Sequence, residues 1–210
     1  YKPQLSVGGD YYDFIEFEDG KIVFCIGDFT GKGLGAALLM ANFQANFHTL
    51  INRRLELDAF IREINTAVNQ ITNGDRFITF FIGEYDVHER RLKYVNAGHN
   101  PPIVISRAQK SLLDKGCIML GTYPVIPEIE IGYCHIQEDE AIILSYTDGL
   151  TDIRNRDGDF FTEELLCDFV KNHYKESASQ FNQSLMDHID AFRGKETIPD
   201  DFTVLTCKVY

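Results

Sequence analysis

Aspartates at four places, each where an apolar run meets a turn, are the residues of this sequence best suited to chemistry. Asp10 follows a glycine pair in VGGDYYD, and Asp28 follows the apolar run KIVFCIG. Asp148 ends the run AIILSYTDG, and Asp200 and Asp201 precede the last apolar run in PDDFTVL. Because carboxylates are costly to bury without an opposing charge, a convergence of these side chains implies a bound cation.

Carboxylate oxygens without histidine or cysteine partners suit hard divalent ions, Mg²⁺ or Mn²⁺. Two such ions that share a bridging carboxylate lie roughly 3.5–4 Å apart, an arrangement common in phosphate-ester hydrolysis. The neighbouring glycines would let the backbone approach the ions and offer carbonyl oxygens. The alternative is a set of unrelated surface aspartates, since aspartate is also a common turn residue.

The segment GDFTGKG, residues 27–33, has the outline of a nucleotide-binding P-loop but not its details. A P-loop needs GxxxxGK followed by Ser or Thr, whose hydroxyl binds Mg²⁺. Counted from Gly27, this segment reads GxxxGKG, one residue short and with glycine in place of the hydroxyl. Asp28 would also repel the phosphates. The segment therefore indicates a structural or metal-holding turn rather than a phosphate loop.

The composition is that of a globular protein with an acidic surface. Of 210 residues, 44% are hydrophobic and 25% charged, and the net charge is -12. This balance argues against nucleic acid and against direct membrane contact, because both partners require basic patches. The five scattered cysteines predict neither a zinc site nor a disulfide framework, so a reducing, cytoplasmic location is expected. The chain begins with Tyr1 rather than Met, and we expect it to be excised from a longer protein.

Apolar periodicity predicts strands, a helix pair, further strands, a second helix pair and a last strand. YYDFIEFEDGKIVFCIGD and the segment from FITFFIGEY to RLKYVNAG both indicate hairpins. The pattern predicts an α+β fold: a four-layer αββα sandwich in one domain, with two mainly antiparallel sheets flanked by helix pairs. Helices are expected over 34–53, from a cap at Asp58 to 71, over 162–174 and over 178–192, and further strands around 103–105, 128–136, 141–146 and 201–210.

Several motifs occur in the order seen in one protein family: VGGDYYD, GDFTGKG, FIT, VNAGHNPP, LGTYP, YTDGLTDIRN, GDFF and DDFTVL. In these the chain resembles the bacterial metal-dependent (PPM, type-2C) serine/threonine protein phosphatases. The similarity is greatest to the branch of stage II sporulation protein E and the stress-response regulator phosphatases. It extends over nearly the whole chain and implies a single phosphatase domain over 1–210, with Tyr1 to Val7 as the remnant of a truncated N-terminal strand.

The resemblance implies two Mn²⁺ or Mg²⁺ ions and the hydrolysis of phosphoserine or phosphothreonine. The expected substrate is a STAS-type anti-sigma-factor antagonist in a partner-switching pathway. An upstream sensor domain is expected in the full-length protein, which can be membrane-anchored upstream, and a homodimer is left open. The alternative is a catalytically degenerate module that only binds a signalling partner. A metal-dependent phosphodiesterase or nuclease is disfavoured by the acidic composition.

Roles in the metal site follow from the resemblance residue by residue. Asp28 resembles the ligand that bridges the two ions, with the backbone carbonyl of Phe29 as a neighbouring ligand. Asp10 is similar to a ligand of the first ion or to a carboxylate that supports such a ligand, and Asp148 is similar to a ligand of the second ion. Asp28 and Asp148 would thus act in catalysis through water activated by the ions.

Four further residues have roles that the resemblance or the chemistry suggests. In DDFT, Asp200 resembles a metal ligand and Asp201 its supporting neighbour. Lys32 is a candidate for binding the substrate phosphate, and the alternative is a solvated lysine at a helix start. His99 in AGHNPP is a candidate acid for the leaving serine alkoxide, and the alternative is a histidine that holds its loop by hydrogen bonds.

Overall fold

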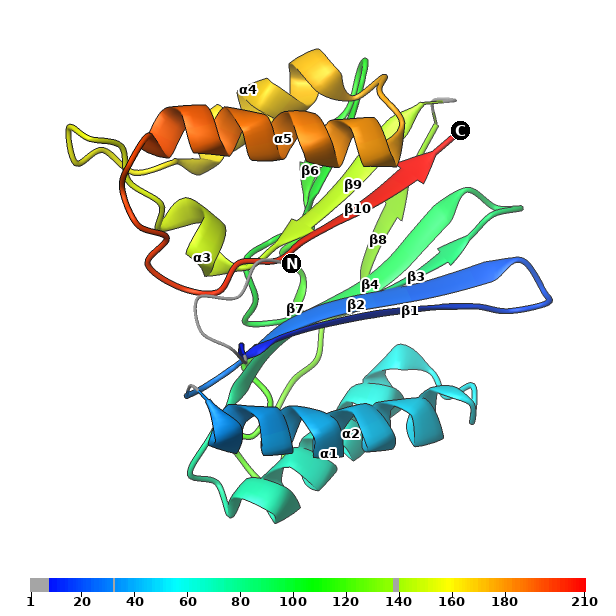
Figure 1. Cartoon of the computed structure of the whole chain (residues 1–210). Helices are drawn as coiled ribbons and strands as arrows, with labels where there is room; N and C mark the ends of the chain where they lie inside the picture. Colours follow the sequence, from blue (N-terminus) through cyan, green and yellow to red (C-terminus); the bar gives the residue numbers. More distant parts are fainter. Residues whose placement is uncertain (1–7, 32, 138–139) are drawn as a thin grey trace. The chain divides into compact units, whose positions relative to one another are not determined.

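The computed structural model describes residues 8–31, 33–137 and 140–210 (Figure 1). The described chain divides into two compact units. We call residues 8–99 and 114–135 the N-terminal unit, and residues 100–113, 136–137 and 140–210 the C-terminal unit. Each unit contains one sheet and its own pair of long helices.

The N-terminal unit is built on a six-stranded sheet in the order β1-β2-β3-β4-β7, with β8 also paired to β4. All of its pairings are antiparallel except the short β4–β7 contact. Helices α1 and α2 lie against one face of this sheet (Figure 1). Its elements are β1 Asp10–Glu16, β2 Lys21–Phe29, α1 Leu34–Ile51, α2 Leu57–Thr72, β3 Ile78–Asp86, β4 Arg91–Ala97, β7 Gly116–Cys117 and β8 Gly132–His135.

Aromatic packing holds α1 and α2 on the sheet. Phe43 and Phe47 are four residues apart on one face of α1, and both are fully buried. Phe43 meets Phe80 of β3 edge to face at 5.2 Å, and Phe47 meets Phe60 of α2 at 5.8 Å. Burial of each such ring contributes roughly 1.5–3 kcal/mol, which fixes α1 over the sheet.

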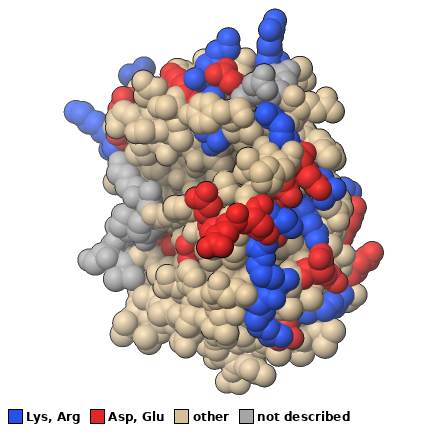
Figure 2. Space-filling model, turned by 90° about the vertical axis from the view of Figure 1, so that its right-hand side faces the viewer, with Lys and Arg blue, Asp and Glu red and all other residues tan. Residues whose placement is uncertain are grey.

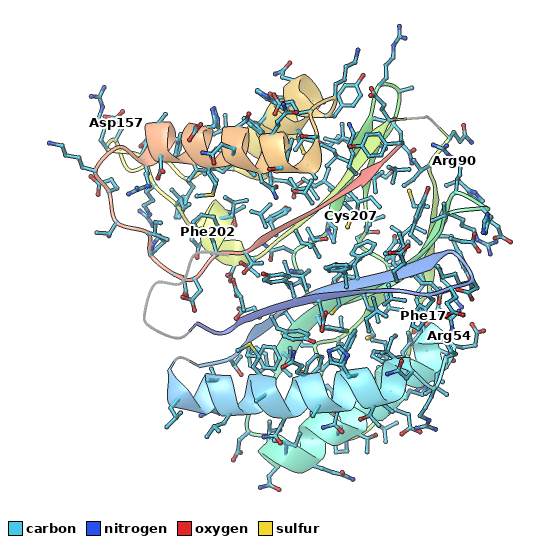
Figure 3. The ribbon with its side chains drawn as sticks, turned by 45° about the vertical axis from the view of Figure 1, so that its right-hand side comes forward. Phe17, Arg54, Arg90, Asp157, Phe202 and Cys207 are labelled. Atoms are coloured by element: carbon cyan, nitrogen blue, oxygen red, sulfur yellow. The ribbon has the colours of Figure 1, made fainter. Side chains whose placement is uncertain are left out.

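The far ends of the β1–β2 hairpin and of the helix pair are joined by a charged contact. The Arg54 guanidinium lies 3.9 Å from the ring centroid of Phe17 and pairs with Asp19 (Figure 3). Acidic and basic side chains are intermingled on the face shown in Figure 2. Such exposed pairs contribute only about 0–1 kcal/mol each, so the buried rings dominate the packing.

The C-terminal unit is built on an antiparallel sheet in the order β10-β9-β5-β6. Phe181 and Leu185 of α5 pack with Leu144 and Tyr146 of β9 in a second core. A capping box at Ser177 and Gln180 begins α5. The elements of this unit are β5 Ile103–Ser106, β6 Lys110–Leu112, β9 Ala141–Tyr146, α3 Asp148–Thr151, α4 Glu163–His173, α5 Ala178–Arg193 and β10 Val204–Val209.

The predicted α+β class, with two mainly antiparallel sheets and two helix pairs, is confirmed. The stacking of these elements into four layers of one domain stays a prediction. The predicted cap at Asp58 is wrong: Glu56 is the N-cap and Leu57 begins α2, because burial of Leu57 outweighs the capping preference of aspartate. The expected strand over 128–136 is shorter, as β8, and the short elements β6, β7 and α3 were not anticipated.

Two predictions fall on residues that the structure does not describe. The remnant strand from Tyr1 to Val7 and the phosphate-binding role of Lys32 lie outside the described residues. None of the helices described combines the length and the hydropathy needed to cross a bilayer.

Candidate functional site

Asp10 and Asp28 are brought together by the register of the first hairpin. Asp10, the first residue of β1, is paired directly with Asp28 near the end of β2. Asp10 is buried and Asp28 is half-buried. Like charges directly opposite each other destabilise a strand pair, so the hairpin gains stability when a cation lies between these carboxylates.

A cradle of oxygen atoms surrounds Gly9, the residue before Asp10. A Cβ atom at Gly9 would lie 3.1 Å from the Phe29 carbonyl oxygen, 3.4 Å from the Gly31 carbonyl oxygen and 3.6 Å from Asp28 Oδ1. Three oxygens of residues 28–31 therefore face one point beside Gly9, where a side chain would force the Phe29 carbonyl to shift. Carbonyl and carboxylate oxygens are the ligands preferred by Mg²⁺ and Mn²⁺, so the residues present fit the predicted metal.

Packing on both sides of the chain holds this turn in place. The Phe29 ring is buried and meets Phe43 of α1 edge to face at 5.2 Å, so its carbonyl is held beside Gly9. The Phe29 amide donates to the Gly9 carbonyl at 3.1 Å. On the other side, the Thr30 hydroxyl donates to the Phe77 carbonyl at 2.8 Å. The turn is thus tied to β1, to α1 and to the start of β3.

His99 follows β4, which is three strands away from β1 in the sheet order β1-β2-β3-β4. Its Nδ1 is 3.0 Å from Oγ1 of Thr79, and Thr79 is the β3 partner of Asp28 in the register. The His99 amide donates to Asn96 Oδ1 at 2.7 Å, and Asn96 Nδ2 donates to the His99 carbonyl at 2.9 Å. The ring and backbone of His99 are therefore held in place, which fits the loop-holding alternative.

Asp148 stands at the start of the short helix α3 in the C-terminal unit. The pKa of its carboxyl is raised, first by desolvation and then by the negative charges of Asp152 and Asp200. The Gly149 amide opposes this shift by a hydrogen bond to the carboxylate. A divalent cation would reverse the pKa shift by compensating the gathered negative charge.

The backbone around Asp148 is fixed to the chain that enters β10. The Thr147 amide donates to the Thr203 carbonyl at 3.1 Å, and the Thr203 amide donates to Thr147 Oγ1 at 2.9 Å. A Cβ atom at Gly149 would lie 2.0 Å from the Asp201 carbonyl oxygen, so only glycine allows this approach. Glycine at this position of TDG thus sets the spacing between the TDG and DDFT segments.

Asp200 and Asp201 have different surroundings in the structure. Asp200 is half-buried, and its charge acts on Asp148. Asp201 is buried, and its amide donates to Asp200 Oδ1 at 2.8 Å. The predicted roles, Asp200 as ligand and Asp201 as support, agree with this arrangement and stay predictions.

The predicted ligands thus form two acidic groups, one in each unit. Asp10 and Asp28 are brought together in the N-terminal unit, and Asp148 and Asp200 in the C-terminal unit. Among the residues described, no three or more His, Cys, Asp or Glu side chains are gathered in a form that could hold a metal ion. The joining of the two acidic groups around shared ions stays a prediction.

Reasoning from the sequence missed the residues that hold His99 in place. Thr79 and Asn96 lie in the motifs FIT and VNAGHNPP, but their contacts to His99 depend on strand register. Asp13 of β1 is paired with residues other than the predicted metal ligands. Its Oδ2 lies 2.8 Å from His48 Nε2 and accepts a hydrogen bond from the Tyr11 hydroxyl at 2.7 Å.

Comparisons with known proteins identify the family of the chain. Residues 18–210 match the model of the family described as Stage II sporulation protein E (SpoIIE). The phosphoserine phosphatase RsbU of Bacillus subtilis (strain 168) is 26% identical over 209 residues, which cover 98% of this chain and 61% of RsbU. The chain therefore spans less than two thirds of the length of that relative.

Solved structures show the same fold. The SiaA-PP2C domain of Pseudomonas aeruginosa superposes with a TM-score of 0.88 at 19% identity, over 100% of this chain and 84% of that one. RsbX in complex with magnesium superposes with a TM-score of 0.70 at 17% identity, over 100% of this chain and 91% of that one. Because the family match covers most of the sequence, the chain belongs to the Stage II sporulation protein E (SpoIIE) family and has the PP2C fold.

Proposed function

We propose that this protein is a Mn²⁺- or Mg²⁺-dependent phosphatase that hydrolyses phosphoserine or phosphothreonine in a protein substrate. The observation that carries the proposal is the oxygen cradle at Gly9, formed beside the paired carboxylates of Asp10 and Asp28. Its donor set suits a hard divalent cation, and the chain belongs to the SpoIIE family. The magnesium complex of RsbX supports the same class of ion.

In this proposal, each acidic group would supply ligands to one of two ions. Asp10, Asp28 and the Phe29 carbonyl would hold one ion, with Asp28 extending to the second. Asp148 and Asp200 would supply the second ion's other carboxylates, and Asp201 would support Asp200 through the backbone. When bound, such ions lower the pKa of water and neutralise charge on the phosphoryl oxygens, so no covalent phosphoenzyme is expected.

Two further residues, His99 and Lys32, are assigned roles other than metal binding. The hydrogen bonds that fix His99 to Thr79 and Asn96 favour a loop-holding role over proton transfer to the leaving serine. Lys32 would bind the substrate phosphate, since it follows Asp28 by four residues in the sequence.

The substrate that we propose is a STAS-type anti-sigma-factor antagonist phosphorylated on serine. RsbU, named a phosphoserine phosphatase, supports phosphoserine as the reacting group. Because RsbU is longer than the match, we further propose an upstream sensor domain in the full-length protein, together with a homodimer and a cytoplasmic location for this domain.

The test is the replacement of one carboxylate from each acidic group. Asp28→Asn and Asp148→Asn should abolish Mn²⁺-dependent release of phosphate while the melting temperature stays near that of the wild type. Asp157→Asn, at an exposed loop position, is the matched control and should keep full activity. Full activity of either site variant, or of the wild type in excess EDTA, would contradict the proposal.

A further inference from the structure

Arg76, in the segment between α2 and β3, lies over the backbone of Gly31 and of Gly35 in α1. A Cβ atom at Gly31 would lie 3.2 Å from Arg76 Nη1. A Cβ atom at Gly35, in the first turn of α1, would lie 3.2 Å from both Nη1 and Nη2 of the same guanidinium. One planar group therefore lies over two glycines that flank the start of α1.

The backbone of Arg76 is itself held by the LGTYP segment. A Cβ atom at Gly121 would lie 2.6 Å from the Arg76 carbonyl oxygen, so glycine is required for this close packing. The Gly121 amide donates to Asn65 Oδ1 of α2 at 2.9 Å. Close to this contact, Ile78, two residues after Arg76, and Leu120, the residue before Gly121, exchange backbone hydrogen bonds of 2.9 and 3.0 Å. The backbone of Arg76 is thus held in place, and its side chain extends from there to Gly31 and Gly35.

Gly31 connects this contact to the oxygen cradle. Its carbonyl oxygen is one of the three oxygens around Gly9, while its Cβ position faces Arg76. Gly31 has a φ of +101°, which glycine adopts readily, and because glycine lacks a Cβ it also allows the turn other conformations when nothing covers it. The neighbouring Thr30 is tied to Phe77, the residue after Arg76, by its hydroxyl and its amide.

We propose that Arg76 is a positioning residue that orders the GDFTGKG turn before a metal ion binds. By covering Gly31 and Gly35, the guanidinium restricts the turn to the conformation in which the Phe29 and Gly31 carbonyls face Gly9. A preordered site loses less conformational entropy on binding, so Arg76 raises the affinity for the ion. The inference rests on the proposed metal-dependent function.

The experiment measures Mn²⁺ binding directly, by calorimetry and by the electron paramagnetic resonance signal of free Mn²⁺. Arg76→Gln should weaken Mn²⁺ binding roughly tenfold, as is typical for residues that support metal ligands. Arg76→Lys keeps the charge but loses the planar fork, so we expect it to bind Mn²⁺ as weakly as Arg76→Gln. Arg53→Gln, at an exposed position in the turn between α1 and α2, is the matched control with unchanged affinity.

A second variant tests the same contact from the other side. Gly35→Gln introduces a side chain at the position where the Arg76 guanidinium lies, and glutamine is a good helix former. The displaced guanidinium has room in a surface pocket that Arg76 lines together with Leu38 and Ile71. It should weaken Mn²⁺ binding as Arg76→Gln does, and the double variant should be no weaker than either single one.

The outcomes separate this inference from the proposed function. Wild-type Mn²⁺ affinity in Arg76→Gln, or additive losses in the double variant, would overturn the role of Arg76 alone. Failure of the wild type to bind Mn²⁺ at all would overturn the proposed function and this inference together. Melting temperatures of all variants are compared with that of Arg53→Gln, and an affinity loss that simply follows the loss of stability would also overturn the positioning role.

Discussion

At Gly9, a single methyl group is enough to disturb the oxygen cradle. The Gly9→Ala substitution puts a carbon 3.1 Å from the Phe29 carbonyl oxygen and 3.6 Å from Asp28 Oδ1. We expect the ligands to be pushed apart and the Mn²⁺ affinity to fall by roughly ten- to a hundredfold. Titration with Mn²⁺, followed by calorimetry and by phosphate release, measures the change. Wild-type affinity in this variant would show that the cradle does not hold the ion.

Single residues were predictable where their chemistry is tied to a place in the chain. Asp10, Asp28 and Asp148 could be selected from sequence because each stands where an apolar run meets a turn beside glycine. Thr79 and Arg76 could not, because their relation to the Asp28 turn depends on the β2–β3 register and on packing over glycine. No spacing in the sequence encodes those contacts.

At the level of the elements, the start of α5 has a contact whose contribution can be measured. Ser177 Oγ accepts the Gln180 amide, and Gln180 Oε1 accepts the Ser177 amide at 3.2 Å. Ser177→Ala removes the cap and should lower the free energy of unfolding by about 1 kcal/mol in urea denaturation. Ser179→Ala, inside the same helix, is the control and should be neutral or slightly stabilising. An unchanged stability of Ser177→Ala would show that the capping box contributes nothing.

The long helices and strands were predictable because their apolar residues repeat at regular spacing over several helical turns or over most of a strand. The expected helix over 178–192 and the strand over 141–146 agree with α5 and β9 to within one residue. The strands β6 and β7 are two or three residues long, and α3 has four residues, so no period can form. The misplaced cap at Asp58 has another cause, since tertiary burial of Leu57 moves the N-cap two residues earlier, to Glu56.

For the whole molecule, the two acidic groups belong to separate compact units, each with its own hydrophobic core. The order of the motifs could indicate the family, which the SpoIIE match confirms, whereas the exclusion of nucleic acid from composition and charge stays a prediction. A site shared by Asp28 and Asp148 cannot be derived from periodicity, because the two residues belong to separate cores, and it stays a prediction. A shared pair of ions would supply the opposing charge that both groups need.

The most direct test of the proposed function is the release of inorganic phosphate from a STAS-domain protein phosphorylated on serine. The assay is run with Mn²⁺, with excess EDTA, and with a phosphodiester such as bis(p-nitrophenyl) phosphate as the control substrate. We predict phosphate release from the phosphoserine protein that requires Mn²⁺, and no hydrolysis of the diester. Binding of the STAS protein without any release of phosphate would contradict the proposed function and indicate a degenerate module, while equal hydrolysis of the diester would indicate a phosphodiesterase.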